Sequence, residues 1–159
     1  MGLLITYFSA GSDEAAAATI DWPTGPEGGP VKRLLKRKEP GHLSIDGHGI
    51  EPVVQLGMFE QLLTGKSFDS QLDDPASRPM VAIRDGGERL VVRIGDDFVD
   101  ALAAVDRDQL PALADKWAEI EEFHGMADPR ALEDRAAALG DLARTSRRHG
   151  ANVYCWVSV

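Results

Sequence analysis

The chain has a single cysteine, Cys155, and no apolar run long enough to span a membrane. One cysteine excludes an internal disulfide framework, and the four His residues show no zinc-finger spacing. A membrane span needs about 18 consecutive apolar residues. The N-terminus also lacks the basic stretch and apolar region of a secretory signal. These absences predict a cytoplasmic protein with no membrane segment.

Positive charge is scarce, with 17 Lys and Arg against 26 Asp and Glu, which gives a net charge of −9. A negative field repels phosphate backbones and anionic lipids, so neither nucleic acid nor a membrane is an expected partner. The sequence has no phosphate-binding loop, dinucleotide fingerprint, nucleophile elbow or His-Glu-x-x-His zinc helix. We therefore expect no cofactor.

What remains is an ordinary globular composition, with 159 residues, of which 43% are hydrophobic and 27% charged. A chain of this length buries roughly 70% of its unfolded surface when it folds. We expect residues 1–159 to form one domain. The abundance of Ala, Asp, Gly and Arg is typical of a bacterial genome rich in G and C.

At both ends of the chain, the residues that would face either side of a strand are mostly apolar. Strands that are covered on both faces show this pattern. The first such run is Leu3 to Phe8, and the second is the terminal NVYCWVSV. We predict that these terminal strands are central and adjacent in a sheet. Cys155 then belongs to the core, where burial would disfavour its thiolate, rather than to a catalytic site.

Turn residues Asp85, Gly86 and Gly87 separate two β-rich runs and predict a hairpin over residues 80–94. Apolar residues at helical spacing predict helices over residues 53–64, 96–105, 108–120 and 128–149, and a shorter helix follows Ser12. Residues 66–79 are rich in turn formers, and residues 21–51 form a probable long loop region in which Pro and Gly gather. The pattern predicts an α+β fold with about four strands, mixed or antiparallel, and helices packed on the sheet.

One polar cluster carries possible metal or acid–base chemistry, and it lies in GHLSIDGHGIEP. Two imidazoles with nearby carboxylates can bind a divalent transition metal. The candidate metal ligands are His42, Asp46, His48 and Glu51. His42 and His48 lie six positions apart, which fixes no geometry on a helix or a strand, and Asp46-Gly47 is a common turn former. A structural loop is the alternative interpretation.

Two further features are candidates for partner binding. Trp22 lies beside Pro23, and an exposed Trp is a frequent anchor at protein interfaces, although it can equally cover the core. A basic cluster in VKRLLKRKEP interrupts the acidic chain and includes Lys32, Arg33, Lys36 and Arg37. It has no interleaved aromatic residues for base stacking, so a solvated loop is the simpler interpretation.

Four segments together resemble a group of small actinobacterial proteins: YFSAGSDEAA, GIEPVVQLGMFEQLLTG, WAEIEEFHG and the terminal YCWVSV. The chain is also distantly similar to the YfbM-like bacterial family, through its Leu-Thr-Gly segment and its final apolar strand. This resemblance implies a common α+β domain and no particular activity.

Two classes of function remain open from the sequence. The first is a non-enzymatic interaction or regulatory protein whose acidic surface attracts an unknown, basic protein partner. The second is a small metal-binding protein or metal-dependent enzyme that uses the loop of residues 42–51. The missing catalytic motifs favour the interaction protein.

Overall fold

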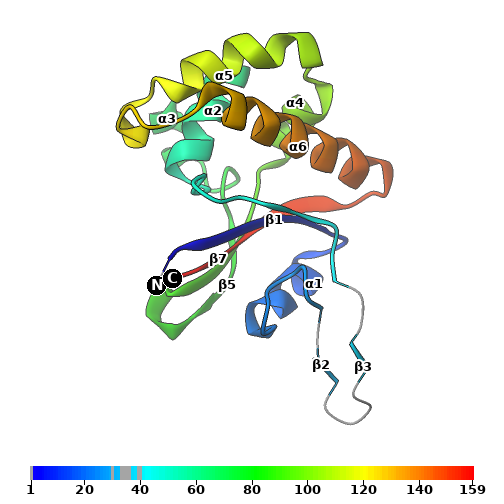
Figure 1. Ribbon diagram of the computed structural model, residues 1–159. Coiled ribbons are helices and arrows are strands. Elements are labelled where there is room, and N and C mark those ends of the chain that lie inside the picture. The colour runs from blue at the N-terminus through cyan, green and yellow to red at the C-terminus, as the bar shows by residue number, and fades with distance from the viewer. Residues whose placement is uncertain (1, 30, 33–36, 39–40) are drawn as a thin grey trace.

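The computed structural model describes residues 2–29, 31–32, 37–38 and 41–159. A five-stranded sheet crosses the middle of the molecule, with helices on both sides (Figure 1). Each strand runs antiparallel to its neighbours. In spatial order the strands are β4 (Ser44–Asp46), β1 (Leu4–Ala10), β7 (Asn152–Ser158), β6 (Arg89–Arg93) and β5 (Met80–Arg84). The predicted α+β class is confirmed, but the prediction of about four strands was one strand short.

The additional strand is β4, which lies inside the predicted loop of residues 21–51. It pairs with β1, with Thr6 opposite Asp46, and forms an edge of the sheet. A three-residue strand with two polar members has too little alternation to be recognised in a sequence. The same region contains β2 (Val31–Lys32) and β3 (Arg37–Lys38), which pair as a separate antiparallel ribbon.

The terminal strands lie together at the centre, as predicted. Strand β7 is the middle strand, and Leu4 of β1 lies opposite Ser158. The two ends of the chain are therefore side by side in Figure 1. Residues 153–157 are all buried, because both faces of β7 are covered. The apolar terminal run is thus satisfied inside the sheet and is not exposed to other molecules.

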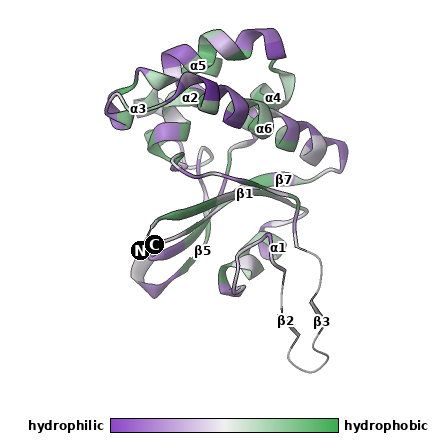
Figure 2. Cartoon of the chain, viewed as in Figure 1, coloured by the Kyte–Doolittle hydropathy of each residue, from purple (hydrophilic) through white to green (hydrophobic). Residues whose placement is uncertain are grey.

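One face of the sheet is covered by a layer of helices (Figure 1). The main members of the layer are α2 (Val54–Thr64), α4 (Asp96–Ala104), α5 (Leu110–Ala118) and α6 (Pro129–Arg148). Helix α6 begins where expected, because the Asp128 side chain accepts a hydrogen bond from the Arg130 backbone N–H and Pro129 occupies the first turn. In Figure 2 hydrophobic and hydrophilic residues mix along the helices, whereas β1 and β7 are largely hydrophobic.

A short helix, α3 (Phe68–Asp73), was not predicted in the segment of turn formers. Ser67 begins it, because its hydroxyl accepts a hydrogen bond from the Ser70 backbone N–H. A helix of six residues is too short to show a repeating apolar stripe, so turn-forming residues dominate its sequence.

The opposite face of the sheet carries α1 (Asp13–Ala18) and a 3₁₀ turn over Thr19–Asp21. A second, smaller cluster of buried side chains lies here and includes Phe8, Ala16, Ile20, Val91, Tyr154 and Trp156. The larger cluster lies under the helical layer. The sheet thus separates two cores of unequal size, because β1 and β7 direct alternate side chains to opposite faces.

Candidate functional site

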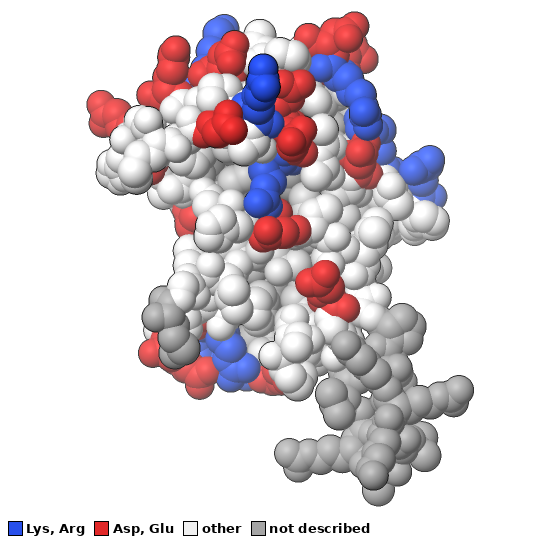
Figure 3. Space-filling view, viewed as in Figure 1, with Lys and Arg blue, Asp and Glu red and all other residues white. Residues whose placement is uncertain are grey.

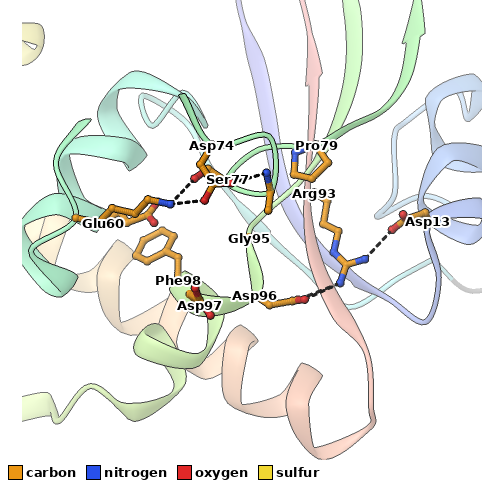
Figure 4. Close-up of a pocket in the computed structure, with 12 residues that line it drawn as sticks. Asp13, Glu60, Asp74, Ser77, Pro79, Arg93, Gly95, Asp96, Asp97 and Phe98 are labelled. Carbon is orange, nitrogen blue, oxygen red and sulfur yellow. Dashed lines mark hydrogen bonds and ion pairs between the residues drawn. The ribbon is translucent and has the colours of Figure 1, made fainter. Parts of the chain in front are cut away.

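The candidate functional site is a pocket of about 400 Å³ between the start of α1, the α3–β5 connection and the start of α4. We call it the acidic pocket, because five carboxylates line it and only two cations do. The carboxylates are Asp13, Glu60, Asp74, Asp96 and Asp97, and the cations are Lys66 and Arg93. In Figure 4 Asp13 lies on one side of Arg93 and the other four carboxylates lie on the opposite side.

Tight backbone packing shapes one wall of the acidic pocket. The Asp74 carboxylate accepts a hydrogen bond from the Ala76 backbone N–H at 2.9 Å, which closes a turn after α3. Gly95 donates its N–H to the Ser77 carbonyl at 2.9 Å. A Cβ atom at Gly95 would lie 2.9 Å from the Ala76 carbonyl oxygen, so only glycine allows this approach. The start of α4 is thereby fixed against the α3–β5 connection.

Lys66 and Arg93 are already paired inside the pocket. Lys66 Nζ lies 2.6 Å from Asp74 Oδ2 and 3.0 Å from Ser77 Oγ. The hydrogen bond from Lys66, together with the Ala76 backbone N–H, holds the pKa of Asp74 below its usual value. Positive charge at Lys66 is therefore matched locally and is not available to an incoming anion.

Arg93 connects the two sides of the sheet. It lies 3.3 Å from Asp13 at the start of α1 and 3.0 Å from Asp96 at the start of α4. The hydrogen bond from Arg93 is the main cause that lowers the pKa of Asp96, with a further hydrogen bond from Arg147. The Tyr154 hydroxyl donates to Asp13 at 2.6 Å. Burial and this hydrogen bond raise the pKa of Tyr154 to about 12, so Tyr154 remains a donor.

A buried ion pair lies behind the pocket. Arg78 Nη2 is 2.8 Å from Glu60 Oε2, and the two side chains are only 10% and 4% exposed. The contact lacks the alignment of a hydrogen bond. Arg78 also donates to the carbonyls of Pro52 and Ser77 and lies 5.4 Å from the centre of the Phe98 ring. Arg78 thus balances the negative charge of Glu60, although Glu60 lines the pocket.

Asp97 differs from the other carboxylates of the pocket. Within the described part of the chain it forms no ion pair and its side chain accepts no hydrogen bond, whereas each of the other four has a cationic partner. It lies at the start of α4, beside Phe98, and is exposed. Asp97 is therefore the carboxylate available to a ligand.

Three of the four predicted metal ligands contact other groups through their side chains. The Asp46 carboxylate accepts from the His48 backbone N–H at 2.9 Å and pairs with Arg135, which also donates to the Asp46 carbonyl. Both oxygens of Glu51 accept backbone N–H groups at the start of α2, at 2.9 and 2.7 Å. The His48 side chain is exposed. Among the described residues no three His, Cys, Asp or Glu side chains are grouped closely enough to hold a metal ion.

His42 has a structural position in the fold. Its ring is stacked on Trp22, with centroids 5.3 Å apart and planes 9° apart, and it also contacts Phe8. Burial lowers the pKa of His42, against a smaller opposing effect of its hydrogen bond to the Ser9 backbone. The neutral imidazole thus belongs to an aromatic stack. The metal site stays a prediction, and it requires His42, Asp46 and Glu51 to leave their present partners.

The predicted partner-binding residues are only partly described. Trp22 is half-buried, because His42 covers one face of its ring. Arg33 and Lys36 lie outside the described residues, and Lys32 and Arg37 are placed by their strands β2 and β3 alone. Partner binding at these positions stays a prediction.

The sequence did not indicate the acidic pocket, because its lining residues come from separate stretches of the chain, at 13, 60, 66, 74–79 and 93–98. Asp96 and Asp97 fell at the start of a predicted helix, and residues 66–79 were interpreted as turns. A usable signal was present: acidic residues recur where elements begin or end, at Asp13, Asp74 and Asp96. Only the strand order brings those ends together.

No family model, curated protein or solved structure matches the chain. In the part of the chain that the structure describes, no helix combines the length and the apolar character needed to cross a membrane.

Proposed function

We propose that the protein is a non-enzymatic binding protein that captures a basic segment of a partner protein, with a Lys or Arg side chain inserted into the acidic pocket. The observation that carries this proposal is Asp97, an exposed carboxylate without a partner among the described residues, in a pocket whose two cations are already paired. An entering cation gains an ion pair there without displacing an existing one.

The apolar part of the acidic pocket suits a long basic side chain. Pro79 and Phe98 line it beside the carboxylates, as Figure 4 shows. Lys and Arg pack their alkyl stems on such surfaces while the charged end reaches a polar group. A volume of about 400 Å³ accommodates one such side chain together with its neighbouring backbone.

The charge pattern elsewhere supports a localised site. Charged side chains of both signs cover the helical layer in Figure 3. Many of them are paired, such as Arg147 with Asp100 and Arg144 with Asp141. Mixed charges of this kind provide little specific attraction, whereas the net charge of −9 attracts a basic partner over a longer range. The pocket would then determine where the partner binds.

One observation favours catalysis instead, since Lys66 Nζ lies 3.0 Å from Ser77 Oγ. A neutral Lys beside a Ser can act as the base that activates the hydroxyl as a nucleophile. Here Lys66 Nζ donates to Ser77 Oγ and also pairs with Asp74 at 2.6 Å, so Lys66 is the donor in this contact and not an acceptor of the Ser77 proton. The contact is therefore a structural hydrogen bond that holds the α3–β5 connection.

The test is the affinity of a short fluorescein-labelled peptide of alternating Lys and Ala, measured by fluorescence anisotropy at several salt concentrations. Asp97→Asn removes the unpaired carboxylate of the pocket. Asp108→Asn is the matched control, because Asp108 is exposed, has no ion pair among the described residues and lies outside the pocket. Both variants change the net charge equally.

We expect the wild type to bind the peptide in a salt-dependent manner. Asp97→Asn should weaken binding about fivefold, which corresponds to roughly 1 kcal/mol, and Asp108→Asn should change it by less than about twofold. Equal losses in the two variants would show that only the overall charge attracts the peptide and would contradict the proposed site. Absence of binding to the wild type would contradict the function.

A further inference from the structure

Two carboxylates of the acidic pocket enclose a guanidinium group, and that group belongs to Arg93 of the same chain. Arg93 Nη1 lies 3.3 Å from Asp13 Oδ1, and Arg93 Nη2 lies 3.0 and 3.1 Å from the two oxygens of Asp96. Figure 4 shows the Arg93 side chain between these two carboxylates. A planar guanidinium with donors on both sides can join two carboxylates in this way, whereas an ammonium group is a point charge. This part of the pocket therefore has the form of a guanidinium site.

Each of the two carboxylates has a second partner that holds it in place. The Tyr154 hydroxyl donates to Asp13 at 2.6 Å. Arg147 donates to both the carboxylate and the carbonyl of Asp96, each at 3.2 Å. The positions of the two carboxylates therefore do not depend on Arg93 alone. Groups that are ordered before a ligand arrives bind it better, because less freedom is lost on binding.

Arg93 is held much less firmly than Arg78, the buried Arg behind the pocket. The Arg78 side chain is 10% exposed and donates to two main-chain carbonyls, so it supports the backbone of the fold. The Arg93 side chain is 25% exposed, and within the described part of the chain it donates only to the two carboxylates. Both carboxylate side chains are about half exposed. Replacement of Arg93 thus leaves no buried charge without a partner, unlike replacement of Arg78.

We propose that Arg93 is an autoinhibitory occupant of the acidic pocket, and that its guanidinium fills the place between Asp13 and Asp96 that an arginine of the partner would otherwise enter. Arg93 thereby leaves Asp97 as the unpaired carboxylate for an incoming cation and limits the affinity of the pocket. This inference rests on the proposed function, and it names arginine as the basic residue that the two carboxylates fit.

The first test uses N-methylguanidinium, which copies the end of an Arg side chain and requires no partner protein. Arg93→Gln removes the internal guanidinium and keeps both carboxylates with their second partners. We expect a saturable shift of the Asp13 and Asp96 amide signals of this variant in ¹H–¹⁵N spectra, and at least about tenfold weaker binding to the wild type. Methylammonium has the same charge without the planar fork, and it should bind the variant about fivefold more weakly.

The second test measures the affinity of the labelled peptide of alternating Lys and Ala. Arg93→Gln should bind it about fivefold more tightly than the wild type, because two more carboxylates become available. Arg130→Gln is the matched control, since Arg130 is exposed, has no ion pair among the described residues and lies outside the pocket. It changes the net charge equally and should alter the affinity by less than about twofold. A peptide of alternating Arg and Ala should gain more from Arg93→Gln, by about tenfold.

Arg93→Lys provides a variant that changes the fold least, because it keeps the charge and the alkyl stem. A Lys ammonium lacks the fork that joins the two carboxylates, so it fills the site incompletely. Methylguanidinium and the Arg peptide should therefore bind Arg93→Lys with affinities between those of the wild type and Arg93→Gln. Affinities equal to those of the wild type would mean that charge alone, and not the guanidinium, closes the site, which contradicts the inference.

Failure of this inference differs from failure of the proposed function. If methylguanidinium binds Arg93→Gln and the wild type equally, or binds neither, the inference is overturned, even where the Lys and Ala peptide still binds through Asp97. Equal gains in peptide affinity for Arg93→Gln and Arg130→Gln would reduce Arg93 to its part of the net charge and would also overturn it. If methylguanidinium binds only Arg93→Gln while the wild type binds no peptide, the guanidinium site is upheld and the proposed function is contradicted.

Discussion

The two faces of the central sheet are covered very differently. On one face four helices bury Tyr7 and Cys155 completely, and the larger core continues through them to Trp117. On the other face, the six-residue helix α1 and a Gly- and Pro-rich loop cover Phe8 and Tyr154 but leave Leu4 60% exposed. The first face thus holds the larger core, and the second leaves a cavity of about 380 Å³ beside Leu4.

The difference begins in the sequence of the covering segments. Helices with repeating apolar stripes, such as α6 with Leu132 and Leu139, cover a sheet continuously. A loop such as DWPTGPEGGP covers only the positions where its backbone can approach, as Gly25 does over Trp156. The acidic pocket includes one residue from the less covered face, Asp13.

The largest expected effect contrasts the same substitution on the two faces. Leu56→Ala, in α2, removes a fully buried side chain and should lower the free energy of unfolding by about 2–5 kcal/mol. Leu4→Ala should change it by less than about 0.5 kcal/mol, because the side chain is largely exposed. Urea denaturation measures both values. Comparable losses would show that the two faces contribute equally to stability.

A second contrast separates the two kinds of carboxylate in the acidic pocket. Glu60→Gln should destabilise the protein by about 3 kcal/mol, because it leaves the buried Arg78 guanidinium without its countercharge. Asp97→Asn should cost less than about 0.5 kcal/mol, since Asp97 is exposed and has no partner among the described residues. If thermal and urea denaturation show no greater loss for Glu60→Gln, the buried pair is not a structural requirement.

The third prediction concerns pH and the aromatic stack on the less covered face. Burial lowers the pKa of His42, so the unfolded chain takes up its proton first as the pH falls. Stability is therefore complete above the unfolded pKa of about 6.5 and decreases as the pH falls through the folded pKa. His42→Asn should reduce the slope of stability between about pH 7.5 and 5.5, and His48→Asn, at an exposed position, should retain it. Identical slopes in wild type and His42→Asn would contradict the assignment.

The smallest expected effect is an absence of reaction at Cys155. The thiol is fully buried under the helical layer, and burial raises its pKa strongly, so the reactive thiolate is suppressed. A thiol reagent such as Ellman's reagent should label the protein only at the rate of global unfolding. Rapid labelling of the native protein would mean that β7 opens locally, against the coverage seen on both of its faces.

Much of the fold could be predicted from the sequence, because long elements carry repeating signals. The stripe of α6 and the two-sided apolar pattern of β7 are visible without a structure, and both were found. The strand β4 and the helix α3 were missed because three and six residues show no period. The candidate site was missed for a different reason. Its residues, such as Asp13 and Arg93, meet only through strand order, which no local pattern contains.

The predicted metal cluster shows a related limit of sequence patterns, because residues that are close in sequence need not have side chains that meet. His42, Asp46 and Glu51 are close in sequence, yet each contacts a different group. His42 belongs to an aromatic stack, Asp46 pairs with Arg135, and Glu51 accepts hydrogen bonds at the start of α2. Proximity along the chain did not bring their side chains together. Charged residues at the ends of elements were the better guide to the acidic pocket.

The most direct measurement is a map of backbone amide shifts in ¹H–¹⁵N spectra while the unlabelled Lys and Ala peptide is added. If the acidic pocket captures a basic side chain, the largest shifts should occur at Ala76, Ser77 and Gly95 and in the first turn of α4, and Asp97→Asn should require about fivefold more peptide to produce them. Shifts spread evenly over the helical layer, or concentrated around Trp156, would contradict the proposed function.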